Sequence, residues 1–225
     1  MTDRAVPRSP LLPVLAVTAL LSALLAACAT PGPHDRFVYV EADSYGCGAA
    51  PGLGCGLALA PALAALDDLD GVAGSSASWD GRYVRLALRP DADEERMLAA
   101  AASVLEGSER RVAPSQVPDA RGRPWYDSVK TVELSRHEAG VIAADFARDM
   151  AHEVELDEPA RRRLEAELRA GFERAFERAH AAGGGVERLW EQFPRARVEF
   201  EGRLTFLSAG QRARVAAFLD EALQG

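Results

Sequence analysis

Two cysteines, Cys47 and Cys55, are the residues of this chain whose type and spacing are best suited to chemistry. They lie in a glycine-rich loop, and a strongly apolar helical pattern begins directly after the second one. A thiolate at the N-terminus of a helix is stabilised by the helix dipole and by free backbone amides, which suits soft-metal binding or thiol chemistry. A structural disulfide between Cys47 and Cys55 is the alternative, and the sequence leaves both interpretations open.

Motifs of catalysis are missing from the rest of the sequence. It has no nucleophile-elbow pattern, no phosphate-binding GxxxxGK[ST] loop and no HExxH pair. The seven residues between the two cysteines also differ from the Cys-x-x-Cys spacing of thiol oxidoreductases. We therefore expect a protein that is not an enzyme.

Two further sets of side chains share the spacing i, i+4, i+7 and are candidate metal ligands. Each set ends in an acid-x-x-His step, which is similar to the ligand pattern of carboxylate-bridged metal bundles. The six candidates are Asp145, Asp149, His152, Glu173, Glu177 and His180. His152 points away from the apolar stripe of its helix, whereas His180 continues the stripe of the next helix. We therefore expect solvated helix faces rather than one shared site.

The first 27 residues have the pattern of a signal peptide, with a short charged region followed by an apolar run from Leu11 to Leu25. The run is too short and too interrupted for a membrane span of about 20 residues. Leu25-Ala26-Ala27-Cys28 resembles the lipobox of bacterial lipoproteins, which implies that Cys28 is diacylated and becomes the mature N-terminus. Because Ala29 rather than Asp follows, the resemblance implies the periplasmic face of the outer membrane.

The formal net charge of −8 argues against nucleic acid and anionic lipid as partners. We expect the membrane to be reached through the lipid on Cys28. With Cys28 modified, Cys47 and Cys55 are left as a pair in a compartment that favours oxidation.

Positions 37–113 show six alternating strand-like and helical patterns. The predicted elements are strands at 37–42, 72–79, 82–89 and 110–113 and helices at 57–69 and 91–105. Asp80-Gly81 is a two-residue hairpin signal between the second and third strands. The order β-α-β-β-α-β is that of a ferredoxin-like fold.

These residues resemble the heavy-metal-associated domain of copper and mercury carriers. In that family paired cysteines lie between the first strand and first helix, and here Cys47 and Cys55 take that place, with Gly71-Val72 after the helix. The family separates its cysteines by two residues, whereas seven separate them here, and Tyr45-Gly46 stands where the family has a Met. The resemblance implies that Cys47 and Cys55 bind Cu(I) or another soft metal.

The remaining half is helical in pattern, so the fold class is α+β, a ferredoxin-like domain followed by a small all-α bundle. Helices are expected to begin near Ser135 and Asp157, a third to be kinked or split at Pro194, and a short one to end the chain. The predicted parts are a signal peptide (1–27), a tether (28–36), the ferredoxin-like domain (37–113), a linker (114–131) and the bundle (132–225).

Two Ser-x-x-Gln/Glu sequences, Ser135 to Glu138 and Ser208 to Gln211, are predicted to be capping boxes at helix starts. Their surroundings are also similar to the LTxxQ motif of Spy-like periplasmic chaperones. That similarity implies the alternative function, a structural or chaperone-like lipoprotein with a disulfide between Cys47 and Cys55 and a protein partner on the helical bundle.

Overall fold

The computed structural model describes residues 36–42, 45–105, 110–117 and 122–222. The predicted signal peptide, Cys28 and all of the tether except Arg36 lie outside these ranges. None of the helices within them is long and apolar enough to cross a membrane. The elements are β1 (Phe37–Glu41), α2 (Gly56–Asp67), β2 (Val72–Ala77), β3 (Tyr83–Leu88), α3 (Glu94–Val104), β4 (Arg110–Val112), a short 3-10 turn (Pro114–Gln116), α4 (Thr131–Val154), α5 (Glu158–Ala181), α6 (Val186–Glu201) and α7 (Ala209–Ala222).

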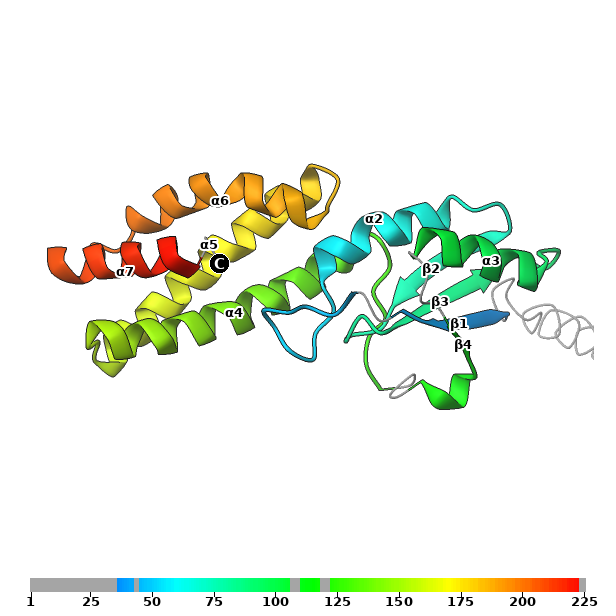
Figure 1. The fold of residues 1–225 in the computed structure, drawn as a ribbon, viewed down its shortest axis with the longest axis horizontal. Coiled ribbons are helices and arrows are strands. Elements are labelled where there is room, and N and C mark those ends of the chain that lie inside the picture. Colours follow the sequence, from blue (N-terminus) through cyan, green and yellow to red (C-terminus); the bar gives the residue numbers. More distant parts are fainter. Residues whose placement is uncertain (1–35, 43–44, 106–109, 118–121, 223–225) are drawn as a thin grey trace, which may run out of the picture.

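The strands form one antiparallel sheet in the order β2-β3-β1-β4. Helices α2 and α3 lie together over one face of it (Figure 1). Successive side chains of a strand point to opposite faces of the sheet. Val38 and Val40 therefore point to the same face, the one covered by the helices, where they are buried. Leu63 of α2 and Met97 of α3 belong to the same buried cluster. The fold class is thus α+β, as predicted.

The connection between β2 and β3 is longer than predicted. The strands end at Ala77 and resume at Tyr83, so five residues rather than Asp80-Gly81 alone make the turn. Ser78 N–H donates to the Tyr83 carbonyl at 2.8 Å, and Gly81 adopts a φ of 71°, which favours glycine. Asp80-Gly81 therefore does lie in the turn between β2 and β3, as predicted, but the turn is longer than two residues and is closed by the hydrogen bonds of Ser78.

The second half is built on a hairpin of two long helices, α4 and α5, against which α6 and α7 pack (Figure 1). Small and large apolar residues fill the core between them. This core contains Ala143, Ala147, Met150, Val154, Leu164, Leu168, Phe200, Leu204, Leu207, Val215 and Leu219. The periodic apolar positions of the sequence therefore do face inward, as an amphipathic pattern requires.

One helix start in this half was predicted wrongly. Helix α4 begins at Thr131, a turn before Ser135, because Asp127 accepts the backbone N–H of Lys130 at 2.8 Å and starts the chain turning there. Of the kink or split predicted at Pro194, the split is absent, since helix α6 is continuous through Pro194. Asp157 does cap α5 as predicted, since its side chain accepts the N–H of Ala160.

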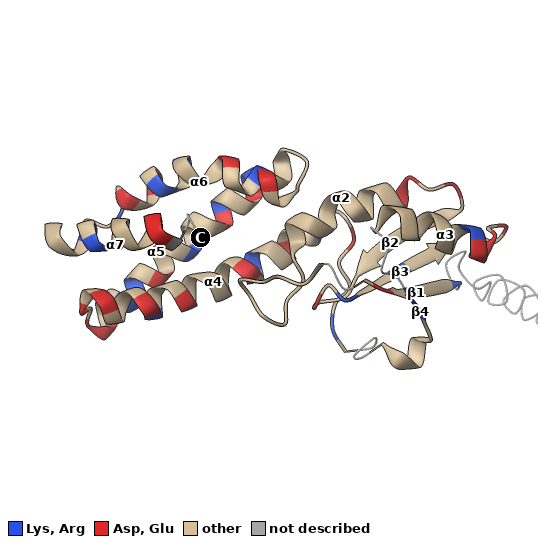
Figure 2. Ribbon diagram, viewed as in Figure 1, with Lys and Arg blue, Asp and Glu red and all other residues tan. Residues whose placement is uncertain are grey.

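The two halves meet where α2 and α4 begin. A Cβ on Gly56 would lie 2.4 Å from Ser135 Oγ and from the Thr131 carbonyl, so only glycine allows this approach. Gly185, in the loop between α5 and α6, donates its N–H to the Leu57 carbonyl at 2.9 Å. Except at its C-terminal end, α2 carries no charge, in contrast to α4, α5 and α6 (Figure 2). The largely uncharged helix α2 thus packs against both the sheet and the helical half.

Candidate functional site

The loop that carries the two cysteines is closed by backbone hydrogen bonds between its arms. Cys47 N–H donates to the Leu53 carbonyl at 2.8 Å, and Cys55 N–H donates to the Tyr45 carbonyl at 2.7 Å. These bonds hold Cys47 and Cys55 on neighbouring arms of the loop. Both thiols are free and partly buried. The disulfide that one interpretation predicted is not formed in this structure.

Glu138 of α4 is the polar residue at the centre of the site. Its side chain is 1% exposed. Its Oε2 accepts the backbone N–H of Gly56 at 2.8 Å and the hydroxyl of Ser135 at 3.1 Å. The N-cap residue of α2, Cys55, makes no capping bond with its own side chain. Glu138 therefore supplies the N-terminal acceptor of α2 from another helix, where a carboxylate is favoured.

Both thiols also interact with Glu138, which adds to the effect of burial on their acidity. Burial, together with the smaller effect of the negative charge of Glu138, raises the pKa of Cys47 to about 12 and that of Cys55 to about 11. Burial also raises the pKa of Glu138, against hydrogen bonds from Gly56, Cys47, Ser135 and Cys55 that lower it. The two thiols are consequently protonated at neutral pH.

His180 of α5 extends this network. Its Nε2 lies 3.0 Å from Ser135 Oγ, the same hydroxyl that bonds to Glu138. Burial lowers the pKa of His180, so its ring is neutral around pH 7. One hydrogen-bonded chain therefore joins α5, α4 and the N-terminus of α2.

The two cysteines and Glu138 line a pocket of about 460 Å³. Apolar and aromatic side chains of α4, α5 and α6 make up most of the rest of its lining, which we call the aromatic wall. These are Ile142, Phe146, Phe172, Phe176, Val186, Leu189, Trp190 and Phe193. Such a pocket, mostly apolar with a few converging polar groups, is typical of small-molecule sites.

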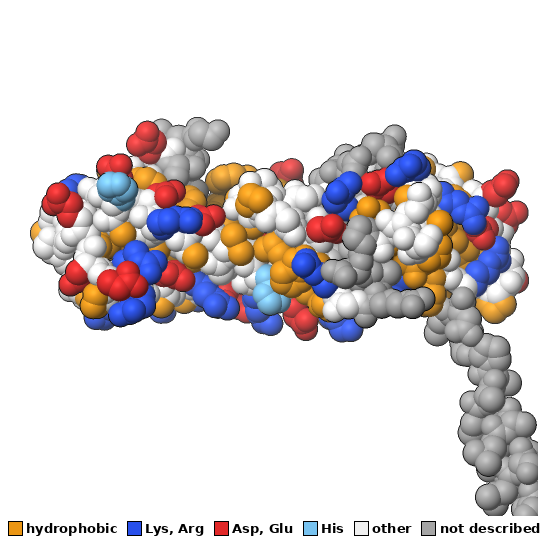
Figure 3. All heavy atoms as spheres, turned by 90° about the horizontal axis from the view of Figure 1, so that it is seen from below, with side chains coloured by type: hydrophobic (Ala, Val, Ile, Leu, Met, Phe, Trp, Pro, Cys, Tyr) orange, Lys and Arg blue, Asp and Glu red, His pale blue; other side chains and the backbone are white. Residues whose placement is uncertain are grey.

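Exposed apolar groups are uneven over the surface. On the face seen from below, hydrophobic side chains reach the surface near the middle of the molecule, whereas acidic and basic groups gather toward both ends (Figure 3). Among the described residues, Trp190 at 52% and Val186 at 38% are large apolar side chains that are exposed beside the pocket. The apolar lining of the pocket thus extends to the protein surface at its opening.

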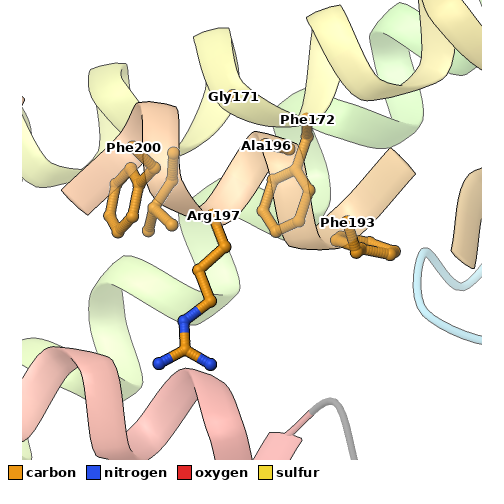
Figure 4. A pocket seen from close by; sticks show the side chains of 7 residues that line it. Gly171, Phe172, Phe193, Ala196, Arg197 and Phe200 are labelled. Carbon is orange, nitrogen blue, oxygen red and sulfur yellow. The ribbon is translucent and has the colours of Figure 1, made fainter. Parts of the chain in front are cut away.

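A second, smaller cavity of about 30 Å³ lies between α5 and α6 (Figure 4). Phe172 and Phe193 line both cavities, and their rings meet edge to face at 6.1 Å. Arg197 extends from α6 toward α7, where it pairs with Asp220 (Figure 4). The guanidinium group of Arg197 therefore forms its ion pair with a residue that does not line the large pocket.

The six candidate ligands on α4 and α5 do not form a site. Asp145 and Asp149 pair with Arg148, Glu173 pairs with Arg169, and Glu177 pairs with Arg136. His152 is exposed, whereas His180 turns inward to Ser135. Within the described residues no three His, Cys, Asp or Glu side chains gather as metal ligands do. The ion pairs hold these acids on separate faces.

One of the two predicted capping boxes is correct. Ser208 N–H donates to Gln211 Oε1 at 3.0 Å, and Gln211 N–H donates to Ser208 Oγ at 3.2 Å, directly before α7. The other is wrong, because Ser135 and Glu138 lie inside α4 and are buried. The carboxylate of Glu138 faces Gly56 rather than the start of its own helix.

Sequence reasoning missed the central role of Glu138, although a signal was present. Glu138 precedes Ile142 by four residues, and Ile142, Phe146, Met150 and Val154 mark the apolar stripe of α4. A carboxylate on the stripe that faces the core is rarely left exposed to solvent. That position identifies it as a buried acid that needs donors.

Comparison with protein-family models, with curated proteins and with solved structures found no match to this chain.

Proposed function

We propose that this chain is a non-enzymatic bacterial envelope lipoprotein that binds a soft metal ion through Cys47 and Cys55. The observation that carries the proposal is that two free thiols from one loop contact the same carboxylate and line the same open pocket. A metal ion that enters the pocket meets a lining to which both cysteines belong. Thiolate is the protein ligand that Cu(I) prefers.

The fold adds support from its topology. We propose that residues 37–113 are a ferredoxin-like domain similar to heavy-metal-associated domains. The element order β-α-β-β-α-β and the strand order β2-β3-β1-β4 agree with that assignment. Cys47 and Cys55 lie between β1 and α2, which is where that family carries its metal-binding cysteines.

The ligand set favours an ion that accepts two sulfur ligands. Binding replaces the two thiol protons, so that two Cys–SH and one Cu(I) give a Cu(I) bis-thiolate and two protons. Zinc would require four ligands, and the described residues offer no group of three. The two-thiol loop therefore fits Cu(I) better than Zn(II).

The cellular location is proposed from the leader. The lipobox-like sequence ending at Cys28 supports a lipid anchor, and Ala29 supports the periplasmic face of the outer membrane. An anchored protein of this kind would meet metal ions in the periplasm.

A second candidate function rests on the aromatic wall of the pocket. The rings of Phe146, Phe172 and Phe193 form an edge-to-face series that ends at the exposed Trp190. An apolar site on the bundle supports the chaperone-like alternative, in which Cys47 and Cys55 are joined by a disulfide. That alternative predicts a loss of thermal stability on reduction and no response to metal.

Cu(I) retention distinguishes the two functions. The sequence has three cysteines, so Cys28→Ser leaves the loop thiols as the only ones. The reduced Cys28→Ser chain should retain one Cu(I) against a competing chelator. The matched chain that also carries Cys47→Ser and Cys55→Ser should retain none. Equal retention by the two chains would end the metal-binding proposal.

A further inference from the structure

We propose that the pocket between the cysteine loop and helices α4, α5 and α6 binds an apolar organic cation, with the positive group at Glu138 and the apolar body against the aromatic wall. The ligand class is an ammonium group attached to one or two rings. This inference does not depend on metal capture, because it uses the carboxylate and the rings rather than the thiolates.

The first observation is that the hydrogen-bond partners of Glu138 are all neutral groups. Glu138 is 1% exposed, and within the described residues no Lys or Arg forms an ion pair with it. The more exposed Glu41, in contrast, pairs with both Arg82 and Arg110. An ionised carboxylate removed from water costs free energy unless a cation accompanies it. A positive ligand would supply the missing partner.

The second observation is that Glu138, although buried from bulk solvent, lines the pocket. Gly56 and Ser135 both donate to Oε2. Oε1 takes part in neither of these bonds, and Glu138 lines the pocket together with Cys47 and Cys55. Thiols are weak donors, so an ammonium group that enters the pocket offers Glu138 a stronger, charge-assisted hydrogen bond.

The third observation is the aromatic part of the pocket lining. Phe146, Phe172, Phe176, Phe193 and Trp190 face the pocket, and a positive charge above an aromatic ring is attracted to it. A volume of about 460 Å³ lies within the range of small-molecule sites. The pocket is thus large enough for a ring system and not merely for a metal ion.

The mouth of the pocket has the same character. Trp190 is exposed at 52%, and Val186 lies one turn before it on α6 at 38%. Large apolar side chains left in water beside a pocket are typical of a surface that a ligand covers. Trp190 can close over the apolar body of the ligand while the charged group lies deeper, at Glu138.

The test compares two probes that differ in charge and hardly in shape. Tryptammonium carries the positive group, and tryptophol, its alcohol analogue, is neutral. In isothermal titration of the reduced Cys28→Ser chain, tryptammonium should bind about tenfold more tightly than tryptophol. Glu138→Gln should remove this preference, since the amide still accepts the Gly56 N–H but carries no charge.

Two further variants separate this inference from metal capture and from folding. Trp190→Ala, at an exposed position, should weaken both probes and keep the preference for the cation. Cys47→Ser with Cys55→Ser should also keep the preference, even though it abolishes the proposed metal site. If the reduced Cys28→Ser chain binds neither probe, or binds both with equal affinity, the inference is wrong, whatever the result for Glu138→Gln. A preference that survives in folded Glu138→Gln would equally overturn it.

Discussion

Glu138 Oε2 lies 2.8 Å from the backbone nitrogen of Gly56, so a carboxylate inside α4 caps the N-terminus of α2. The bond joins two residues that are 82 positions apart in the sequence. The bond lies where the cysteine loop and the first helix of the sheet domain meet the helical half. The site exists because α2 and α4 begin side by side.

Replacing Glu138 should separate its roles as acceptor and as charge. Glu138→Leu leaves the buried Gly56 N–H without an acceptor and should lower the free energy of unfolding by about 1–3 kcal/mol. Glu138→Gln keeps the acceptor and should lose less. Urea unfolding measures both. Glu133→Leu, at an exposed position in the first turn of the same helix, is the control and should lose only the helix-dipole interaction of that acid, about 0.3–1 kcal/mol. Equal losses for Leu and Gln at position 138 would show that the cap contributes nothing.

Gly56→Ala should be destabilising although alanine normally favours a helix. The added Cβ would lie 2.4 Å from Ser135 Oγ and from the Thr131 carbonyl, so α2 and α4 must move apart. Overpacking of this kind costs about 1–3 kcal/mol. The matched change is Gly48→Ala in the cysteine loop, where a Cβ would meet nothing within 4 Å. Gly48→Ala should therefore leave the thermal unfolding temperature unchanged. If Gly56→Ala left it unchanged as well, the close contact between α2 and α4 would be contradicted.

The loop thiols should react slowly with alkylating agents. Because burial and Glu138 raise the pKa of Cys47 to about 12 and that of Cys55 to about 11, the thiolate fraction at pH 8 is small. Iodoacetamide should modify them on the order of 100-fold more slowly in the folded chain than in urea. Glu138→Gln should accelerate the reaction modestly, since burial is the larger cause. Folded and unfolded chains that react at one rate would exclude the raised pKa values.

Alkaline pH should weaken the fold through the same two thiols. The folded state keeps them protonated, whereas the unfolded chain releases their protons near pH 8.5. Their contribution to stability is thus complete below about pH 8.5 and is lost as the pH rises toward 11 to 12. Urea unfolding should show this decline in the reduced Cys28→Ser chain. The decline should be smaller once Cys47→Ser and Cys55→Ser are added, and identical profiles would contradict the assignment.

Much of the fold could be predicted from patterns that local physics controls. Alternating residues in β3, the apolar period of α2 and the Asp157 cap of α5 all acted as expected. The start of α4 was misplaced because Ser135 and Glu138 match a capping box, a local pattern, while their bonds are made to Gly56 and His180. Partners distant in sequence leave no periodic signal.

The site was likewise predicted only in part. Cys47 and Cys55 were identified from residue type and loop position. The pocket was not, because its wall combines residues of α4, α5 and α6 that meet only when the helices pack. The acids of the i, i+4, i+7 sets were explained instead by neighbouring arginines, such as Arg169 beside Glu173.

The central claim is that the two loop thiols bind one soft metal ion. X-ray absorption at the copper edge of the Cu(I)-loaded Cys28→Ser chain tests it most directly, since it identifies the atoms bound to the metal. We expect one copper per chain with two sulfur neighbours. Copper bound by nitrogen or oxygen alone, or sulfur ligation that persists after Cys47→Ser and Cys55→Ser, would contradict it.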